Sequence, residues 1–170
     1  MPENKLRLPH VSFGVKGRPV MVFVAGFPDD EISGWGNMIY KFSETHRLIC
    51  LCWPGYQRGG AASLPRFGYN VLEVIEAMHE TLADISTEEN IDNFTLVCHD
   101  WGSYLSLLYQ NKYPERVSSV VCFDVGVLKK PPLKDMVVIL FYQLWFCFSY
   151  IVACFLGRWT GQALLFFFFI

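Results

Sequence analysis

The 170-residue sequence has almost no charge near its C-terminal end, where Arg158 is the only charged residue after Asp135. The first 135 residues carry 13 basic and 16 acidic groups, as an ordinary soluble domain does. A net charge of −2 gives no electrostatic reason to bind nucleic acid. Because 52% of the residues are hydrophobic, the composition excludes a disordered chain and is sufficient for one packed core.

Metal-binding and secretion signals are also missing. The sequence contains no C-x-x-C motif and no cysteine pair with zinc-ligand spacing beside histidines, so we expect no metal site. The N-terminal segment MPENKLRLPH lacks the apolar stretch of a signal peptide, which predicts a cytoplasmic location. The cysteines lie within apolar runs and are predicted to be buried and reduced: Cys50, Cys52, Cys98, Cys122, Cys147 and Cys154.

Apolar runs that end at turn residues alternate with helical patterns. Continuous apolar runs are typical of strands buried on both faces of a parallel sheet. Asn70 is positioned to cap the longest predicted helix. The pattern predicts an α/β protein whose working residues follow the carboxyl ends of the strands. The predicted strands are 11–15 (an edge strand), 19–25, 48–53, 94–98 and 117–123, and the predicted helices are 35–42, 70–85 and 102–113.

The segment Cys98-His99-Asp100-Trp101-Gly102 lies where a predicted buried strand meets a helix. A nucleophile elbow has this form: a reactive residue on a sharp strand-to-helix turn, with small residues two positions away on each side. Gly102 meets this requirement, and Cys98 is a small substitute for glycine on the other side. The spacing therefore makes Asp100 the candidate nucleophile.

Two anchors, AGFPDD at 25–30 and CHDWG at 98–102, resemble the epoxide hydrolase and haloalkane dehalogenase branch of the α/β-hydrolase superfamily. The resemblance extends over roughly residues 12–126 and includes W-P-G-Y at 53–56. It implies a mostly parallel sheet flanked by helices, with residues 1–127 forming the N-terminal part of the hydrolase core. It also implies hydrolysis of a small apolar molecule with water and without a cofactor.

The resemblance assigns roles to four residues of the core. Asp100 would attack the substrate carbon and form an ester, with the backbone N–H groups of Phe27 and Trp101 as the oxyanion hole. The Trp101 indole N–H would donate to the leaving group of a bound substrate. Asp124, after the next strand, is a candidate for the acid that orients a histidine. Two alternatives remain open: Asp100 caps a helix, and Asp124 is an ordinary loop residue or cap.

The sequence departs from this family at two functional positions. The superfamily order is nucleophile, acid, histidine, but this chain has no histidine after Asp100. Ala25 stands where the family usually has histidine. We therefore expect a chain that is the N-terminal part of a longer hydrolase, without the C-terminal strands, and that cannot efficiently hydrolyse its own ester. The alternative is a non-catalytic, membrane-tethered binding protein on a degenerate hydrolase fold. A serine esterase is a weaker rival because the elbow carries Asp.

The last segment, 128–170, has two interpretations that are not mutually exclusive. Residues 136–157 contain no charge and are long enough to span a bilayer. Lys129, Lys130 and Lys134 precede them, which would leave the core on the cytoplasmic side. Alternatively, 128–170 begins the helical cap that roofs the pocket in relatives, where Tyr142 and Tyr150 would contact substrate.

Overall fold

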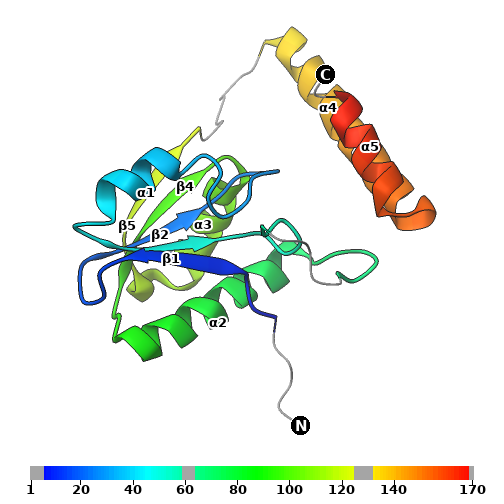
Figure 1. Cartoon of the computed structure of the whole chain (residues 1–170). Coiled ribbons are helices and arrows are strands. Elements are labelled where there is room, and N and C mark those ends of the chain that lie inside the picture. The colour runs from blue at the N-terminus through cyan, green and yellow to red at the C-terminus, as the bar shows by residue number, and fades with distance from the viewer. Residues whose placement is uncertain (1–5, 59–63, 125–131, 169–170) are drawn as a thin grey trace. The chain divides into compact units, whose positions relative to one another are not determined.

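The computed structural model describes residues 6–58, 64–124 and 132–168, with side chains as far as residue 165. The chain divides into two compact units, Met1–Gly126 and Val127–Ile170 (Figure 1). The first is an α/β unit and the second is helical. The residues that join them, 125–131, lie outside the described part of the chain. They include Lys129 and Lys130, two of the lysines that precede the apolar run.

The first unit contains a five-stranded sheet in the order β1-β3-β2-β4-β5. β1 pairs antiparallel with β3, and the other neighbours are parallel, as the sequence predicts. β2 and β4 occupy the middle, with Val24 aligned with Cys98. The loops that follow these two strands therefore meet at one edge of the sheet. The strands are β1 (His10–Gly14), β2 (Val20–Val24), β3 (Arg47–Leu51), β4 (Phe94–His99) and β5 (Val117–Phe123).

Alternating side chains of the central strands form two apolar layers. Phe23, Leu48 and Cys50 pack with Trp35 and with side chains of helix α1 (Gly36–Phe42). Val22 and Leu96 point to the opposite face, where they pack against helices α2 (Val71–Glu89) and α3 (Trp101–Lys112). Figure 1 shows α1 on one side of the sheet and α2 on the other. The unit is therefore a three-layer α/β/α arrangement.

Helix α2 begins where the sequence predicts and extends four residues further. The Asn70 side chain accepts a hydrogen bond from Glu73 N, and the Glu73 carboxylate accepts one from Asn70 N, which completes a capping box. The helix ends at Asn90, whose positive φ of 55° is the usual helix-terminating conformation. The predicted cap at Asn70 is confirmed.

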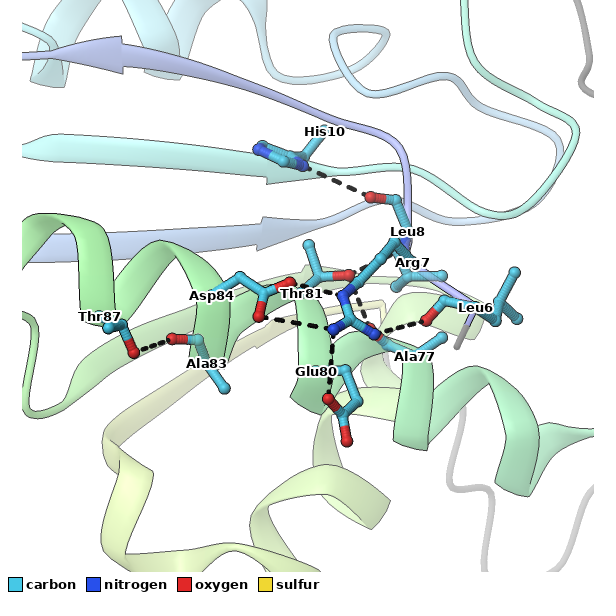
Figure 2. A network of polar contacts seen from close by, with 10 residues as sticks. All are labelled: Leu6, Arg7, Leu8, His10, Ala77, Glu80, Thr81, Ala83, Asp84 and Thr87. Atoms are coloured by element: carbon cyan, nitrogen blue, oxygen red, sulfur yellow. Dashed lines mark hydrogen bonds and ion pairs between the residues drawn. The ribbon is translucent and has the colours of Figure 1, made fainter. Parts of the chain in front are cut away.

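The segment that precedes β1 is tied to α2 by polar contacts (Figure 2). Arg7 Nε donates to Asp84 Oδ2 at 2.6 Å, and the guanidinium also lies 3.3 Å from Glu80. Leu8 N donates to Thr81 Oγ1 at 2.8 Å in a buried position. These contacts hold the edge strand against the helical layer.

The predicted burial of β5 and of three of the cysteines is wrong. β5 is not covered on both faces: Val121 and Phe123 are exposed because β5 is the edge strand of the described sheet and has a helix on one face only. Cys147 is exposed, since it lies on the outer surface of a helix in the second unit, and Cys122 and Cys154 are only partly buried.

The buried face of helix α3 is smaller and more polar than the face that the positions of its apolar residues predict. Tyr104 and Leu107 are exposed, whereas Ser103 and Ser106 are buried beside Leu105. Small side chains are needed on this face because the helix lies directly on the sheet. Pro114 follows α3, as expected from its inability to continue a helix, and opens a short 3₁₀ turn (Pro114–Arg116).

The second unit is a pair of helices. α4 (Leu133–Leu156) contains the predicted charge-free run, and α5 (Arg158–Phe168) packs against it. Gly157 separates them with a φ of 101°, a conformation that favours glycine. In the described part of the chain, α4 is the one helix long and apolar enough to cross a membrane. The sequence predicts the apolar helix but not the helix that packs on it.

Candidate active site

Asp100 lies at a sharp turn between β4 and α3. Its φ of 53° and ψ of −127° fall in a region that residues other than glycine rarely adopt. The turn is held from both sides, because Asp100 N donates to Phe123 O at 3.3 Å and Asp100 O accepts from Ser103 N at 3.0 Å. A strained strand-to-helix turn of this kind holds a nucleophile above the edge of the sheet.

The Asp100 carboxylate faces the loop after β2. Phe27 N donates to Asp100 Oδ1 at 3.0 Å, and the helix makes no capping bond to this side chain. Asp100 therefore occupies the N-cap position of α3, but its side chain does not cap the helix. Oδ2 has no protein donor among the described residues, so one oxygen is held and the other is available. The hydrogen bond with Phe27 is the one that would polarise the carbonyl of an ester formed through Oδ2.

Two glycines allow this close approach. A Cβ on Gly26 would lie 2.7 Å from Asp100 Cβ, and one on Gly102 would lie 2.2 Å from Val24 O. The second contact is with backbone, which cannot move aside without distorting β2. Glycine is therefore required at 102 to bring α3 onto the sheet, as the small residue of the elbow motif predicts.

Trp53 secures the loop after β2 at the position of the unusual Ala25. Its indole Nε1 donates to Ala25 O at 2.8 Å. Alanine at 25 therefore leaves the backbone of the loop after β2 anchored. No role for Trp53 is predicted from the sequence, although its place in W-P-G-Y at the end of a strand is a signal for one.

A second group of contacts joins the loop after β2 to the loop after β3. Arg58 Nε donates to Asp30 Oδ2 at 2.8 Å, and Arg58 N donates to the buried carboxylate of Glu31 at 3.3 Å. Asp30 Oδ1 also accepts from Ile32 N and Ser33 N. Burial alone would raise the pKa of Asp30, but these hydrogen bonds outweigh it and lower the pKa to about 2. No local sequence pattern indicates this pairing, because Asp30 and Arg58 are 28 residues apart.

The electrostatic environment of the elbow is acidic. Burial raises the pKa of Asp29, the nearby His99 opposes this shift, and the carboxylates of Asp30 and Asp100 add to it. The Asp100 carboxylate accepts a hydrogen bond from the backbone N–H of Phe27.

Asp124 lies directly after β5 with a φ of 54°. Its side chain is 81% exposed, and Oδ2 is 4.0 Å from His99 Nε2. The structure therefore brings Asp124 to the same edge of the sheet as Asp100 and opposite an imidazole, although that imidazole belongs to His99, which precedes Asp100 in the chain. Its role as the catalytic acid stays a prediction.

The other three histidines are distant from the elbow. His79 stacks on Tyr113 with ring centroids 3.8 Å apart, near the opposite end of α3 from Asp100. His46 precedes β3 at the amino edge of the parallel strands and contacts Thr45. His10 lies on β1, three strands from β4. In the described residues, no three His, Cys, Asp or Glu side chains form a metal site.

The remaining predicted site residues are placed as follows. Trp101 begins α3 with its side chain about half exposed and edge-on to Tyr104. Tyr142 and Tyr150 lie on α4 in the second unit, where Tyr142 is edge-on to Phe146 and Tyr150 is exposed. Substrate contacts for these three residues stay predictions.

The mostly parallel sheet, the strained turn at Asp100 and the loop after β2 that contacts it are the features of an α/β hydrolase. The family model described as "alpha/beta hydrolase fold" matches residues 19–151, so the chain belongs to this family. That match includes the whole of the elbow and most of α4.

The relatives include several epoxide hydrolases. Epoxide hydrolase 1 of Caenorhabditis elegans is 26% identical over 122 residues, which are 72% of this chain and 29% of the relative. The cis-3-alkyl-4-alkyloxetan-2-one decarboxylase of Shewanella oneidensis is 28% identical over 150 residues, 86% of this chain and 43% of that protein. An epoxide hydrolase from Bacillus megaterium, of known structure, has a TM-score of 0.55 and 26% identity over 69% of this chain and 38% of its own. The chain thus spans less than half the length of these relatives.

Proposed function

We propose that this chain carries the nucleophile half of an epoxide-hydrolase-type active site, with Asp100 as the nucleophile. The observation that carries the proposal is the hydrogen bond from Phe27 N to Asp100 Oδ1 at a strained elbow. It holds one carboxylate oxygen and leaves the second free to attack. The relatives named epoxide hydrolases support an epoxide as the substrate class.

The chemistry at Asp100 follows from this geometry. Oδ2 attacks a ring carbon, the ring C–O bond breaks, and the resulting alkoxide takes a proton. Oδ1 becomes the carbonyl oxygen of the ester, where the Phe27 N–H, and by family resemblance the Trp101 N–H, stabilise the negative charge that develops when water attacks. In the cap interpretation, Tyr142 or Tyr150 would supply the proton to the alkoxide.

Hydrolysis of the ester needs a base that activates water. No histidine follows Asp100 in the sequence, and His79, His46 and His10 lie away from the elbow. We infer that the 170 residues form the ester and release it slowly. Further chain, corresponding to the remaining length of the relatives, would supply the base.

A second candidate is a non-catalytic protein that binds apolar molecules on the same fold. The absence of a base and the alanine at 25 favour it. In that case a ligand would bind near Asp100 without forming a covalent bond.

Covalent trapping separates the two. The full chain is incubated with styrene oxide, and its intact mass and peptides are measured. We expect addition of the full mass of one epoxide on the peptide that contains Asp100, because ring opening expels no leaving group. The Asp100→Asn variant should lose this adduct, and Asp124→Asn should retain it because an acid partner acts only in hydrolysis.

The controls separate chemistry from nonspecific alkylation. An adduct on Cys147 that persists in Asp100→Asn reports only the exposed thiol. Binding of the diol or epoxide, detected by calorimetry, without any adduct on the Asp100 peptide would overturn the nucleophile assignment and support the binding protein.

A further inference from the structure

Helix α4 exposes apolar side chains around most of its circumference. Almost none of it is buried within the described structure, unlike the core helix of a soluble domain. Twelve of its large apolar side chains are half or more exposed: Leu133, Met136, Val137, Val138, Leu140, Phe141, Leu144, Phe148, Tyr150, Ile151, Phe155 and Leu156. A partner protein that covered one face would leave the others in water.

The contact between α4 and α5 is made by small residues. Ser149 is buried, and a Cβ on Gly161 would lie 2.4 Å from Ala153 Cβ and 2.7 Å from Ser149 O. Trp145 Nε1 donates to Leu164 O at 3.0 Å and so satisfies its polar group inside the pair. Close backbone packing over Gly, Ala and Ser is how helices associate in lipid, where no hydrophobic effect drives them together.

The dimensions and the ends of α4 match a bilayer. Its 24 residues extend about 36 Å, compared with about 30 Å for a hydrocarbon core. Lys134 and Asp135 lie at one end, and Arg158 with the exposed Trp159 follows the other. Charged and aromatic residues at both ends of an apolar helix are typical of the two membrane interfaces. Gln143 is the residue that opposes insertion.

We propose that the α4–α5 hairpin inserts into a lipid bilayer, with α4 crossing it and α5 packed beside α4 through Gly161. A bilayer would cover at once all the faces of α4 that α5 leaves exposed. The family match ends at residue 151, inside α4, so this hairpin is not accounted for by that match over its full length.

The inference does not depend on the reaction at Asp100. A membrane-spanning α4 is incompatible only with the form of the cap interpretation in which Tyr142 and Tyr150 lie over a soluble pocket. Failure of insertion therefore leaves the nucleophile assignment unaffected, and failure of covalent trapping leaves insertion unaffected.

The test is synthesis of the full chain in a cell-free system with phosphatidylcholine vesicles, followed by flotation and an alkaline carbonate wash. We expect the chain to float and to resist the wash. Cys147, exposed on α4, should be shielded from a membrane-impermeant maleimide in vesicles and labelled after detergent is added. Neutral vesicles are chosen because the proposal rests on apolar contact.

Matched variants assign the effect to α4. Leu144 is exposed near the middle of α4, and Leu72 is similarly exposed on α2. Leu144→Glu should reduce the carbonate-resistant fraction at least tenfold, because a charge at mid-helix is costly in lipid. Leu72→Glu should leave it unchanged, and Leu144→Phe should retain insertion.

Three results would overturn the proposal. Chain that stays at the bottom of the gradient in the presence of vesicles has not inserted. Chain that floats but is released by carbonate, with Cys147 labelled, is adsorbed to the surface only. Equal losses for Leu144→Glu and Leu72→Glu would show that flotation does not depend on α4.

Discussion

The first unit encloses a core of large apolar side chains, as for Phe23 and Leu48 with no exposed surface, whereas in the second unit Phe141 and Leu144 are each 60% exposed. The sequence differs in the same way, because all but one of the charges lie before residue 136. The first unit therefore shields a core of apolar residues with its own helices, whereas the apolar residues of α4 are covered only in part by α5. This contrast is the one that the proposed insertion of the α4–α5 hairpin into a bilayer would explain.

The largest expected effect comes from comparing a Phe→Ala substitution in each of the two units. Phe23→Ala removes a ring that is fully buried and edge-on to Trp35 at 5.1 Å, so we expect a loss of about 3–5 kcal/mol in the unfolding free energy of the first unit. Phe141→Ala should change that value by less than about 0.5 kcal/mol. Urea unfolding in mild detergent, followed by amide exchange of β2 and β4, measures both. Comparable losses would mean that α4 is part of the same folding unit.

The strand positions could be predicted closely because each apolar run ends at a residue that terminates a strand. The run at 19–25 ends at Gly26, and the observed β2 lies within it at Val20–Val24. The elbow position was likewise predictable, since Asp100 stands between a strand and Gly102. These features depend on neighbouring residues, which is the information that sequence patterns contain.

The missed features depend on residues far apart in the chain. The Trp53 bond to Ala25 O and the Arg58 bond to Asp30 join loops after different strands. The packing of α5 on α4 depends on the space left by Ser149 opposite Gly161, and composition alone does not show that space. The exposure of β5 follows from its position at the edge of the described sheet. The residues of β5 alone do not show that it is an edge strand.

A second test compares two glycines, one in each unit. Gly102→Ala places a Cβ 2.2 Å from Val24 O, so we expect a loss of about 1–3 kcal/mol in the first unit and a slower trapping reaction at Asp100. Gly161→Ala should leave that unfolding free energy unchanged and separate α5 from α4. The separation is measured by spin labels on Cys147 and on a cysteine introduced as Gln162→Cys.

Gly36→Ala is the control for these substitutions. Nothing lies within 4 Å of a Cβ at this position, and its φ is not in the left-handed region. It should therefore alter neither the unfolding free energy by more than about 0.5 kcal/mol nor the label distance. If Gly102→Ala were equally neutral, the close packing of α3 on β2 would not be a requirement of the elbow.

The smallest expected effect is the dependence of the unfolding free energy on pH. We expect Asp30 to cause such a dependence in the first unit only. The pKa of this carboxyl is lowered to about 2 from 3.8, so the folded state binds fewer protons than the unfolded chain in that interval. The stabilisation, at most about 2 kcal/mol, is complete above about pH 4 and is lost as the pH falls toward 2. In Asp30→Asn we expect lower stability at neutral pH and a shallower decline between pH 4 and 2, measured by urea unfolding across this range. The carbonate-resistant fraction of the hairpin should be the same in both proteins, since Asp30 lies outside it. A decline as steep as in the unsubstituted protein would show that the Asp30–Arg58 contact does not stabilise the loop that holds Phe27.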